Sequence, residues 1–174
     1  MNENFEILLG DVRTRLAEIP DGSIHCCVTS PPYYALRNYG SGDQIGQEQS
    51  PEEYVAEMVK VFREVRRVLH PSGTCWLNLG DTYSRGDRQG QPAQVGVCAS
   101  GNDEGKYGNL DSSPKLGDHP FLKKKDLIGI PWLVAFALQR DGWYLRCDIV
   151  WHKPNPMPES VDDRPTRSHE FIFL

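Results

Sequence analysis

The chain has 174 residues, of which 39% are hydrophobic and 25% are charged, and its formal net charge is −5. This length fits a single domain, and the acidic balance disfavours a general nucleic-acid coat protein without excluding a local basic groove. No apolar run approaches the length of a membrane span, and residues 1–4 do not resemble the start of a signal peptide. The five cysteines form no Cys-x-x-Cys pair. We therefore expect no disulfide framework, no metal site and a reducing cytoplasm.

Apolar and helical patterns alternate along the first 80 or so residues. The predicted elements are strands at Phe5–Leu9, Ile24–Val28 and Thr74–Leu79, and helices at Val12–Ile19 and Pro51–Leu69. The long helix has a clear start, because Ser50 can cap its first turn and proline is favoured at the first helical position. The sequence Pro71-Ser72-Gly73 predicts where this helix stops.

The second half contains a long polar segment and then three further elements. Ser84–Lys125 is rich in Gly, Ser, Asp, Asn and Gln, and a structureless loop of this length is usually functional or disordered. A helix at Leu127–Leu138 and strands at Trp143–Trp151 and His169–Leu174 are expected after it. The alternation predicts an α/β fold around a largely parallel sheet. The last strand ends with the chain, so residues 1–174 are expected to be a fragment.

The most informative segment is the turn Ser30-Pro31-Pro32-Tyr33, directly after the second predicted strand. Proline lacks the N–H that a central strand needs, so the two prolines end this strand abruptly. Ligands bind at the carboxyl ends of strands in open α/β sheets. The turn presents there a hydroxyl, rigid carbonyls and an aromatic ring, which suit a flat ring with an amino group, such as a nucleobase.

The order strand, Gly-Asp, short helix, turn, strand and Ser30-Pro31-Pro32-Tyr33 resembles the DNA amino-methyltransferases. Their catalytic tetrapeptide is Ser, Asp or Asn, then Pro-Pro, then an aromatic residue. The resemblance is most specific over residues 5–33 and is strong again over 127–174. It implies an α/β, Rossmann-like methyltransferase sheet with helices on both faces, incomplete in this chain. It also implies S-adenosylmethionine as cofactor, double-stranded DNA as partner, and a bacterial or phage-encoded cytoplasmic enzyme.

The resemblance gives the residues of the turn their roles. The Ser30 side chain and the Pro31 carbonyl would accept hydrogen bonds from the exocyclic amino group of cytosine (N4) or adenine (N6). These acceptors free the nitrogen lone pair, and preoriented dipoles stabilise the charge that develops on it. Pro32 completes the rigid turn, and Tyr33 would stack on a base flipped out of the duplex. Such stacking is worth roughly 1–3 kcal/mol.

Further site residues follow from the same resemblance, and each has a structural alternative. Asp11 would bind the adenine amino group of the cofactor, with Ser30 nearby, or would only cap the following helix. The base pocket or the DNA surface would receive the side chains of Tyr34, Asp81, Trp151, Lys153, Arg164 and Arg167. The alternatives are core packing for Trp151, a simple turn for Asp81 and solvated surface positions for the two arginines.

The polar insert at about 84–125 has two interpretations. It could contact phosphates through Arg85, Arg88 and the cluster Lys123-Lys124-Lys125, since phosphate contacts position a protein without reading sequence. It could instead be disordered. We expect disorder in the unbound protein and partial ordering on DNA.

Two parts of a complete enzyme have no counterpart in the sequence: a Phe-x-Gly-x-Gly cofactor loop and a target-recognition region. The chain is therefore expected to be the target-base half of the enzyme, with the missing half as a partner, and alone to be inactive and to bind cofactor weakly. The motif order disfavours an RNA or protein-amide methyltransferase, and the charge disfavours a non-catalytic nucleic-acid-binding fragment. Serine at position 30 leans toward cytosine. The choice between cytosine and adenine stays open, as do the recognition sequence, membership of a restriction system and the oligomeric state.

Overall fold

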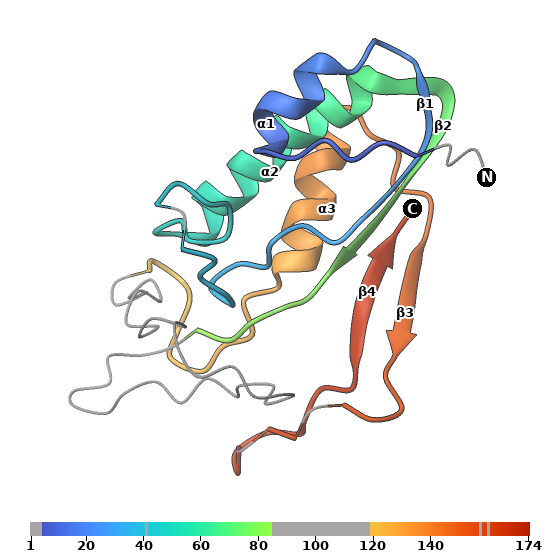
Figure 1. Cartoon of the computed structure of the whole chain (residues 1–174). Helices are drawn as coiled ribbons and strands as arrows, with labels where there is room; N and C mark the ends of the chain where they lie inside the picture. The colour runs from blue at the N-terminus through green and yellow to red at the C-terminus, as the bar shows by residue number, and fades with distance from the viewer. Residues whose placement is uncertain (1–4, 41, 85–118, 157, 160) are drawn as a thin grey trace, which may run out of the picture.

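The computed structural model describes residues 5–40, 42–84, 119–156, 158–159 and 161–174 (Figure 1). The elements are α1 (Val12–Arg15), a 3₁₀ turn η1 (Leu16–Glu18), β1 (Ile24–Thr29), α2 (Pro51–Val68), β2 (Leu69–Leu79), α3 (Ile130–Arg140), β3 (Asp148–His152) and β4 (His169–Phe173). The predicted short helix, second strand, long helix and last strand are confirmed. Among the described helices, none combines the length and apolarity needed to cross a membrane.

Four strands form one sheet in the order β1-β2-β4-β3. β1 runs parallel to β2, whereas β4 is antiparallel to both β2 and β3. The expectation of a largely parallel sheet is therefore wrong. The helix α2 connects β1 to β2 and allows their parallel pairing, while β3 is joined to β4 without a crossover helix, which leaves an antiparallel pair.

The helices gather on one side of the sheet (Figure 1). Phe62 of α2 and Leu138 of α3 line one small cavity together with Leu77 and Phe173 of the sheet, so both helices cover the same face. Strand side chains alternate between the two faces, and Val28 on the opposite face is 78% exposed. The family resemblance implies helices on both faces of the sheet. The described helices cover one of these faces.

The helix α2 provides the main apolar stripe of the core. At its start, the Ser50 hydroxyl accepts a hydrogen bond from the Glu53 backbone N–H at 3.2 Å, as predicted for a cap. Its buried residues recur at helical spacing: Tyr54, Met58, Val61, Phe62, Val65 and Val68. Tyr54 and Met58 have no exposed surface. This packing fixes the position of the Tyr54 hydroxyl, which reaches the end of β1.

The first predicted strand is absent. Residues 5–9 form no strand, and the side chains of Phe5, Ile7 and Leu9 are 67%, 79% and 85% exposed. An extended segment needs a neighbouring strand to satisfy its backbone N–H and C=O groups, and β1 pairs with β2 alone among the described residues. The apolar pattern of this segment therefore has no sheet to join in the described part of the chain.

Three other boundaries differ from those predicted. β2 begins at Leu69 and includes Pro71-Ser72-Gly73, because the pairing jumps from Ile24↔Leu69 to Cys26↔Thr74 and these residues bulge out of the ladder. α3 begins later than expected, after Gly129, whose φ of 83° lies in the left-handed region. β3 is confined to Asp148–His152, because residues 143–147 lie outside the regular ladder.

The ends of the polar insert are held together, although residues 85–118 lie outside the described part of the chain. The Ser84 N–H donates to the Asp126 carbonyl at 2.8 Å, and the Lys125 N–H donates to the Ser84 carbonyl at 2.9 Å. Tyr83 and Leu127 form an antiparallel bridge next to them. The predicted disorder of the insert, and the roles of Arg85 and Arg88, fall on the residues that the structure does not describe.

Candidate active site

The turn at residues 30–33 follows β1, and a side chain of α2 holds it in place. The Tyr54 hydroxyl donates to the Pro32 carbonyl at 2.9 Å, and the Leu36 N–H lies 3.4 Å from the Tyr33 carbonyl. None of the described residues donates a hydrogen bond to the Pro31 carbonyl. The turn therefore leaves one rigid carbonyl available beside the exposed Ser30.

The Tyr33 ring is held by its hydroxyl group and along one edge. Its hydroxyl donates to the Glu170 carboxylate at 3.0 Å and accepts from the Asn78 amide at 2.9 Å. Its carbon atoms lie against Gly80, where a built Cβ would stand 2.5 Å from Tyr33 Cε2. Burial raises the pKa of Tyr33 to about 12, and the neighbouring Glu170 adds to the rise. The ring is thus a neutral phenol in a defined orientation.

Glu170 of β4 contacts residues at or just after the ends of β1, β2 and β3. Its carboxylate accepts from Tyr33 and Asn78 and pairs with the Lys153 ammonium. Burial alone would raise the pKa of Glu170, but the hydrogen bonds from Lys153, Asn78 and Tyr33 outweigh burial and hold the pKa below its usual range. The carboxylate is therefore ionised at neutral pH.

Lys153 and Trp151 lie beside this carboxylate, as part of the predicted site. The Lys153 ammonium is 5.8 Å from the centre of the Trp151 ring, and that ring is 49% exposed. Trp151 is also the register partner of Glu170. The structure therefore brings Lys153 and Trp151 together with Ser30 and Tyr33 through Glu170, and Trp151 is not a core residue.

Tyr34 has a different environment from the one predicted. Its side chain is 1% exposed and belongs to the hydrophobic core, where its ring lies 5.5 Å from that of Tyr54. A ring buried there is not open to a base or to DNA, which corrects the predicted contact. Adjacent aromatic residues at the end of a strand point in different directions, so Tyr33 and Tyr34 take separate roles.

Asp81 is committed to the protein interior. Its Oδ1 accepts from the backbone N–H groups of Thr82, Gly129 and Ile130 at 2.9–3.0 Å, and its Oδ2 lies 3.2 Å from the Arg167 guanidinium. Its side chain is 3% exposed. Asp81 therefore joins the end of β2 to the start of α3, and the structure gives it contacts that a base-pocket role would have to break.

The two arginines also face partners within the chain. The Arg164 guanidinium stacks on the Tyr83 ring at 3.7 Å and pairs with Glu159 at 2.5 Å. Arg167 pairs with Asp81, and its side chain is 17% exposed. The structural alternative of simply solvated arginines does not hold, because the two guanidinium groups hold the segment before β4 against Tyr83 and Asp81. Their contact with the base pocket or DNA stays a prediction.

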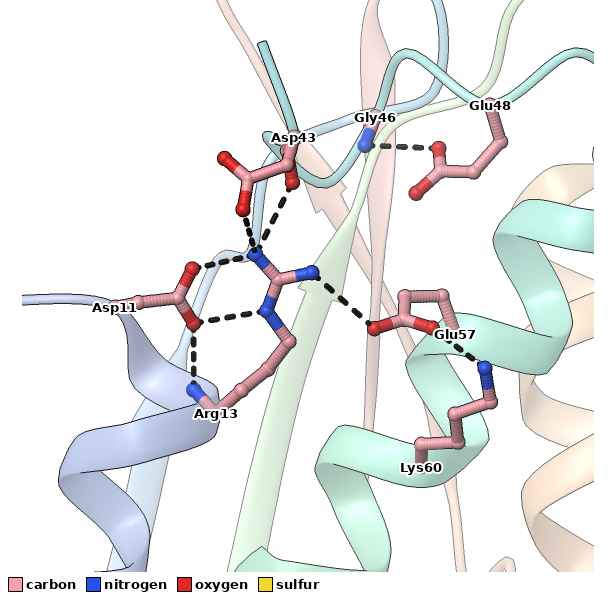
Figure 2. A network of polar contacts seen from close by, with 7 residues as sticks. All are labelled: Asp11, Arg13, Asp43, Gly46, Glu48, Glu57 and Lys60. Carbon is pink, nitrogen blue, oxygen red and sulfur yellow. Dashed lines mark hydrogen bonds and ion pairs between the residues drawn. The ribbon is translucent and has the colours of Figure 1, made fainter. Parts of the chain in front are cut away.

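Asp11 lies at a second charged cluster, shown in Figure 2. Its carboxylate accepts from the Arg13 backbone N–H at 2.8 Å and from the Arg13 side chain at 2.9 and 2.5 Å. Arg13 reaches on to Asp43 at 3.3 Å and to Glu57 at 3.6 Å. The hydrogen bond from Arg13 lowers the pKa of Asp11 to about 2. Asp11 is a helix cap, as one interpretation predicted, and its side chain is 41% exposed.

Sequence reasoning missed four residues that build the site: Tyr54, Asn78, Gly80 and Glu170. One signal was available, because Glu170 is a lone carboxylate directly before the apolar run Phe171-Ile172-Phe173-Leu174, within the last predicted strand. Tyr54 carried no such signal, since its spacing fits a core residue. Within the described residues, no cluster of three His, Cys, Asp or Glu could hold a metal ion.

We predict that Tyr54→Phe destabilises the chain by about 1–2 kcal/mol, because the partly buried Pro32 carbonyl loses its donor. Tyr34→Phe is the matched control: it removes a buried hydroxyl that bonds to none of the described residues, so its effect should be near zero. Urea unfolding followed by tryptophan fluorescence measures both. Equal losses in the two variants would contradict the role of the Tyr54 hydroxyl.

Comparisons with known proteins agree on one class. A family model described as a DNA methylase matches residues 24–174. Type II methyltransferase M.SmaI of Serratia marcescens is 48% identical over 169 residues, 97% of this chain and 54% of that protein. Type II methyltransferase M.XycI of Xanthomonas campestris pv. cyanopsidis is 52% identical over 172 residues, 95% of this chain and 52% of that protein. The chain thus spans about half the length of these curated relatives.

Two solved structures share the fold. A putative DNA modification methylase from Thermus thermophilus, complexed with S-adenosyl-L-methionine, superposes with a TM-score of 0.57 and 22% identity, over 95% of this chain and 50% of that one. The cytosine-N4-specific PvuII DNA methyltransferase gives a TM-score of 0.58 and 18% identity, over 95% and 46% of the two chains. At these identities the likeness concerns the fold.

Proposed function

Since this chain belongs to the DNA methylase family, we propose that it is the target-base half of an amino-methyltransferase. The whole enzyme would transfer a methyl group from S-adenosylmethionine to an exocyclic amino nitrogen in double-stranded DNA. The observation that carries the proposal is the Pro31 carbonyl, which accepts from none of the described residues while its neighbours Pro32 and Tyr33 are fixed.

The chemistry requires acceptors on both hydrogens of the amino group. The nitrogen lone pair of such a group is delocalised into the ring, which makes it a poor nucleophile. Accepting its two N–H bonds at the Pro31 carbonyl and the Ser30 hydroxyl favours a pyramidal nitrogen, and fixed dipoles stabilise the positive charge that develops. The Tyr33 ring, held by Glu170, offers a surface on which a flipped base stacks.

We propose N4 of cytosine as the methylated atom. Serine at position 30 leans this way within the family that the turn resembles, and the PvuII neighbour is named as cytosine-N4-specific. Lys153 and Trp151 would line the base pocket, because they lie beside Glu170 on the same side as Tyr33. Asp81, Arg164 and Arg167 would support the pocket through the contacts described above.

Asp11 and Ser30 are proposed to contact the cofactor. S-adenosylmethionine supplies an electrophilic methyl group when it is bound. The Asp11 carboxylate fits an amino-group donor such as that of adenine, because it accepts hydrogen bonds only and is 41% exposed even with Arg13 bound to it. Arg13 would keep this carboxylate ionised and oriented.

The test compares the chain with a chimera in which residues 1–174 replace the matching half of M.XycI, which is 52% identical to it. We expect the chimera to methylate DNA, the chain alone to lack activity, and Ser30→Ala to abolish most methylation by the chimera. Mass analysis of nucleosides from the treated DNA identifies the product. N6-methyladenine would overturn the choice of cytosine, and a DNA-binding chimera that methylates nothing would favour a non-catalytic role.

A further inference from the structure

A chain of hydrogen bonds connects Ser30, the proposed catalytic serine, to the partly buried carboxylate of Glu170. The Ser30 hydroxyl lies 3.3 Å from the Tyr33 hydroxyl, which lies 3.0 Å from Glu170 Oε2. The Asn78 amide nitrogen is 2.9 Å from the Tyr33 hydroxyl and 3.0 Å from the same carboxylate oxygen. The Ser30–Tyr33 bond is longer than the usual ~2.8 Å between hydroxyls, as catalytic hydrogen bonds often are before a substrate binds.

The charge at the end of the chain sets the direction of every bond in it. An ionised carboxylate only accepts, so Tyr33 must donate its single proton to Glu170. The Tyr33 oxygen is then an acceptor for its other neighbours. Asn78 donates to it through the amide nitrogen, and Ser30 donates its only proton. The Ser30 oxygen keeps both lone pairs for an incoming group.

We propose that Glu170 is a positioning residue that makes the Ser30 hydroxyl act as a pure hydrogen-bond acceptor toward the amino group of the target base. A hydroxyl is otherwise ambivalent: it donates as readily as it accepts. A serine whose proton pointed at the amino group would oppose the N–H that it must receive. Lys153, paired with Glu170, holds the carboxylate in place. This inference rests on the proposed function for its consequence in methyl transfer.

The decisive experiment is a double-mutant cycle in the chimera. In Glu170→Gln, the amide can donate to the Tyr33 oxygen, so Tyr33 turns its proton toward Ser30. We expect kcat to fall about tenfold or more, as for loss of a charge-assisted bond, with the KM for cofactor unchanged. In a Ser30→Asp background, the carboxylate at position 30 carries no proton that must be turned away from the amino group. The same Glu170→Gln change should therefore have little effect.

Two controls separate this role from simple stability. Glu64→Gln removes a carboxylate that pairs with Arg67 on α2 and is 41% exposed, and it should leave kcat unchanged. Ser30→Asn serves as a second background if Ser30→Asp folds poorly. Equal losses from Glu170→Gln in the serine and aspartate or asparagine backgrounds would overturn the proposal, because a structural role does not depend on the residue at position 30.

A measurement on the 174-residue chain tests the chain of bonds without any methyl transfer. With 3-fluorotyrosine incorporated, the fluorine resonance of Tyr33 is assigned by its loss in Tyr33→Phe and is titrated with pH. The charged groups that act on this phenol are Glu170 and Arg37. Glu170→Gln should lower its titration midpoint, because Glu170 is one of the groups that raise it, whereas Glu64→Gln on α2 should leave it unchanged. An unmoved Tyr33 midpoint overturns the inference, and an inactive chimera with a moved midpoint overturns only the proposed function.

Discussion

Gly80→Ala should displace the Tyr33 ring and remove most of the activity of the chimera. A Cβ at this position would stand 2.5 Å from Tyr33 Cε2 and 2.7 Å from Cδ2, closer than any real packing contact. The Gly80 backbone needs no left-handed conformation, so the added methyl group acts through this contact alone. We expect a loss of about 1–3 kcal/mol in the free energy of unfolding. Methyl transfer should fall about 100-fold, since misplacement by an ångström can have that effect.

Gly42→Ala is the matched control for this substitution. Gly42 also has no left-handed φ, and a Cβ built there meets nothing within 4 Å. Its replacement should change neither urea unfolding nor the rate of methylation. If Gly80→Ala behaves like Gly42→Ala in both measurements, the Tyr33 ring does not lie on the end of β2, and the proposed orientation of the phenol fails with it.

The local features of this chain could be predicted because local physics decides them. Proline stops β1 whatever the rest of the chain does, and the apolar spacing and serine cap of α2 specify a helix with one buried face. The same local signals predicted the residues that we propose to contact the target base at the turn, Ser30 and Pro31. Whether two strands pair in parallel could not be predicted from local signals, because it depends on whether a helix crosses between the two strands.

The supports of the turn could not be predicted because they come from distant parts of the chain. Glu170 is 137 residues from Tyr33 in sequence, and Asn78 is 45 residues away. Their meeting depends on β4 inserting between β2 and β3 in the sheet. The motif therefore predicted the group that we propose to touch substrate, whereas the groups that orient it could be found only from the fold.

Burial decided the remaining assignments. Tyr34 and Arg167 carry groups that suit a base or a phosphate, and sequence alone could not show that Tyr34 is buried and that Arg167 pairs with Asp81. Arg167 follows a run of polar residues, a pattern typical of an exposed loop. Its guanidinium turns inward because Asp81 is a buried carboxylate that requires a partner.

Asp81→Ala should destabilise the chain by about 3–5 kcal/mol, because it leaves the buried Arg167 guanidinium without its counter-charge. It also removes the acceptor of three backbone N–H groups, at Thr82, Gly129 and Ile130. Asp81→Asn keeps an oxygen for these donors and should lose less. Urea unfolding followed by tryptophan fluorescence measures both variants.

A double-mutant cycle with Arg167→Met identifies the origin of the loss. If the cost of Asp81→Ala comes mainly from an unpaired guanidinium, the double variant Asp81→Ala with Arg167→Met should be more stable than the sum of the single losses predicts. Asp21→Ala provides the exposed comparison, because Asp21 pairs with Arg67 but is 77% exposed. Its loss should stay below about 1 kcal/mol.

Additive losses at Asp81 and Arg167, or a loss at Asp81 as small as that at Asp21, would show that the pair is not the junction between β2 and the segment before β4. Asp81 and Arg167 would then be free for the DNA-facing role that sequence alone suggested.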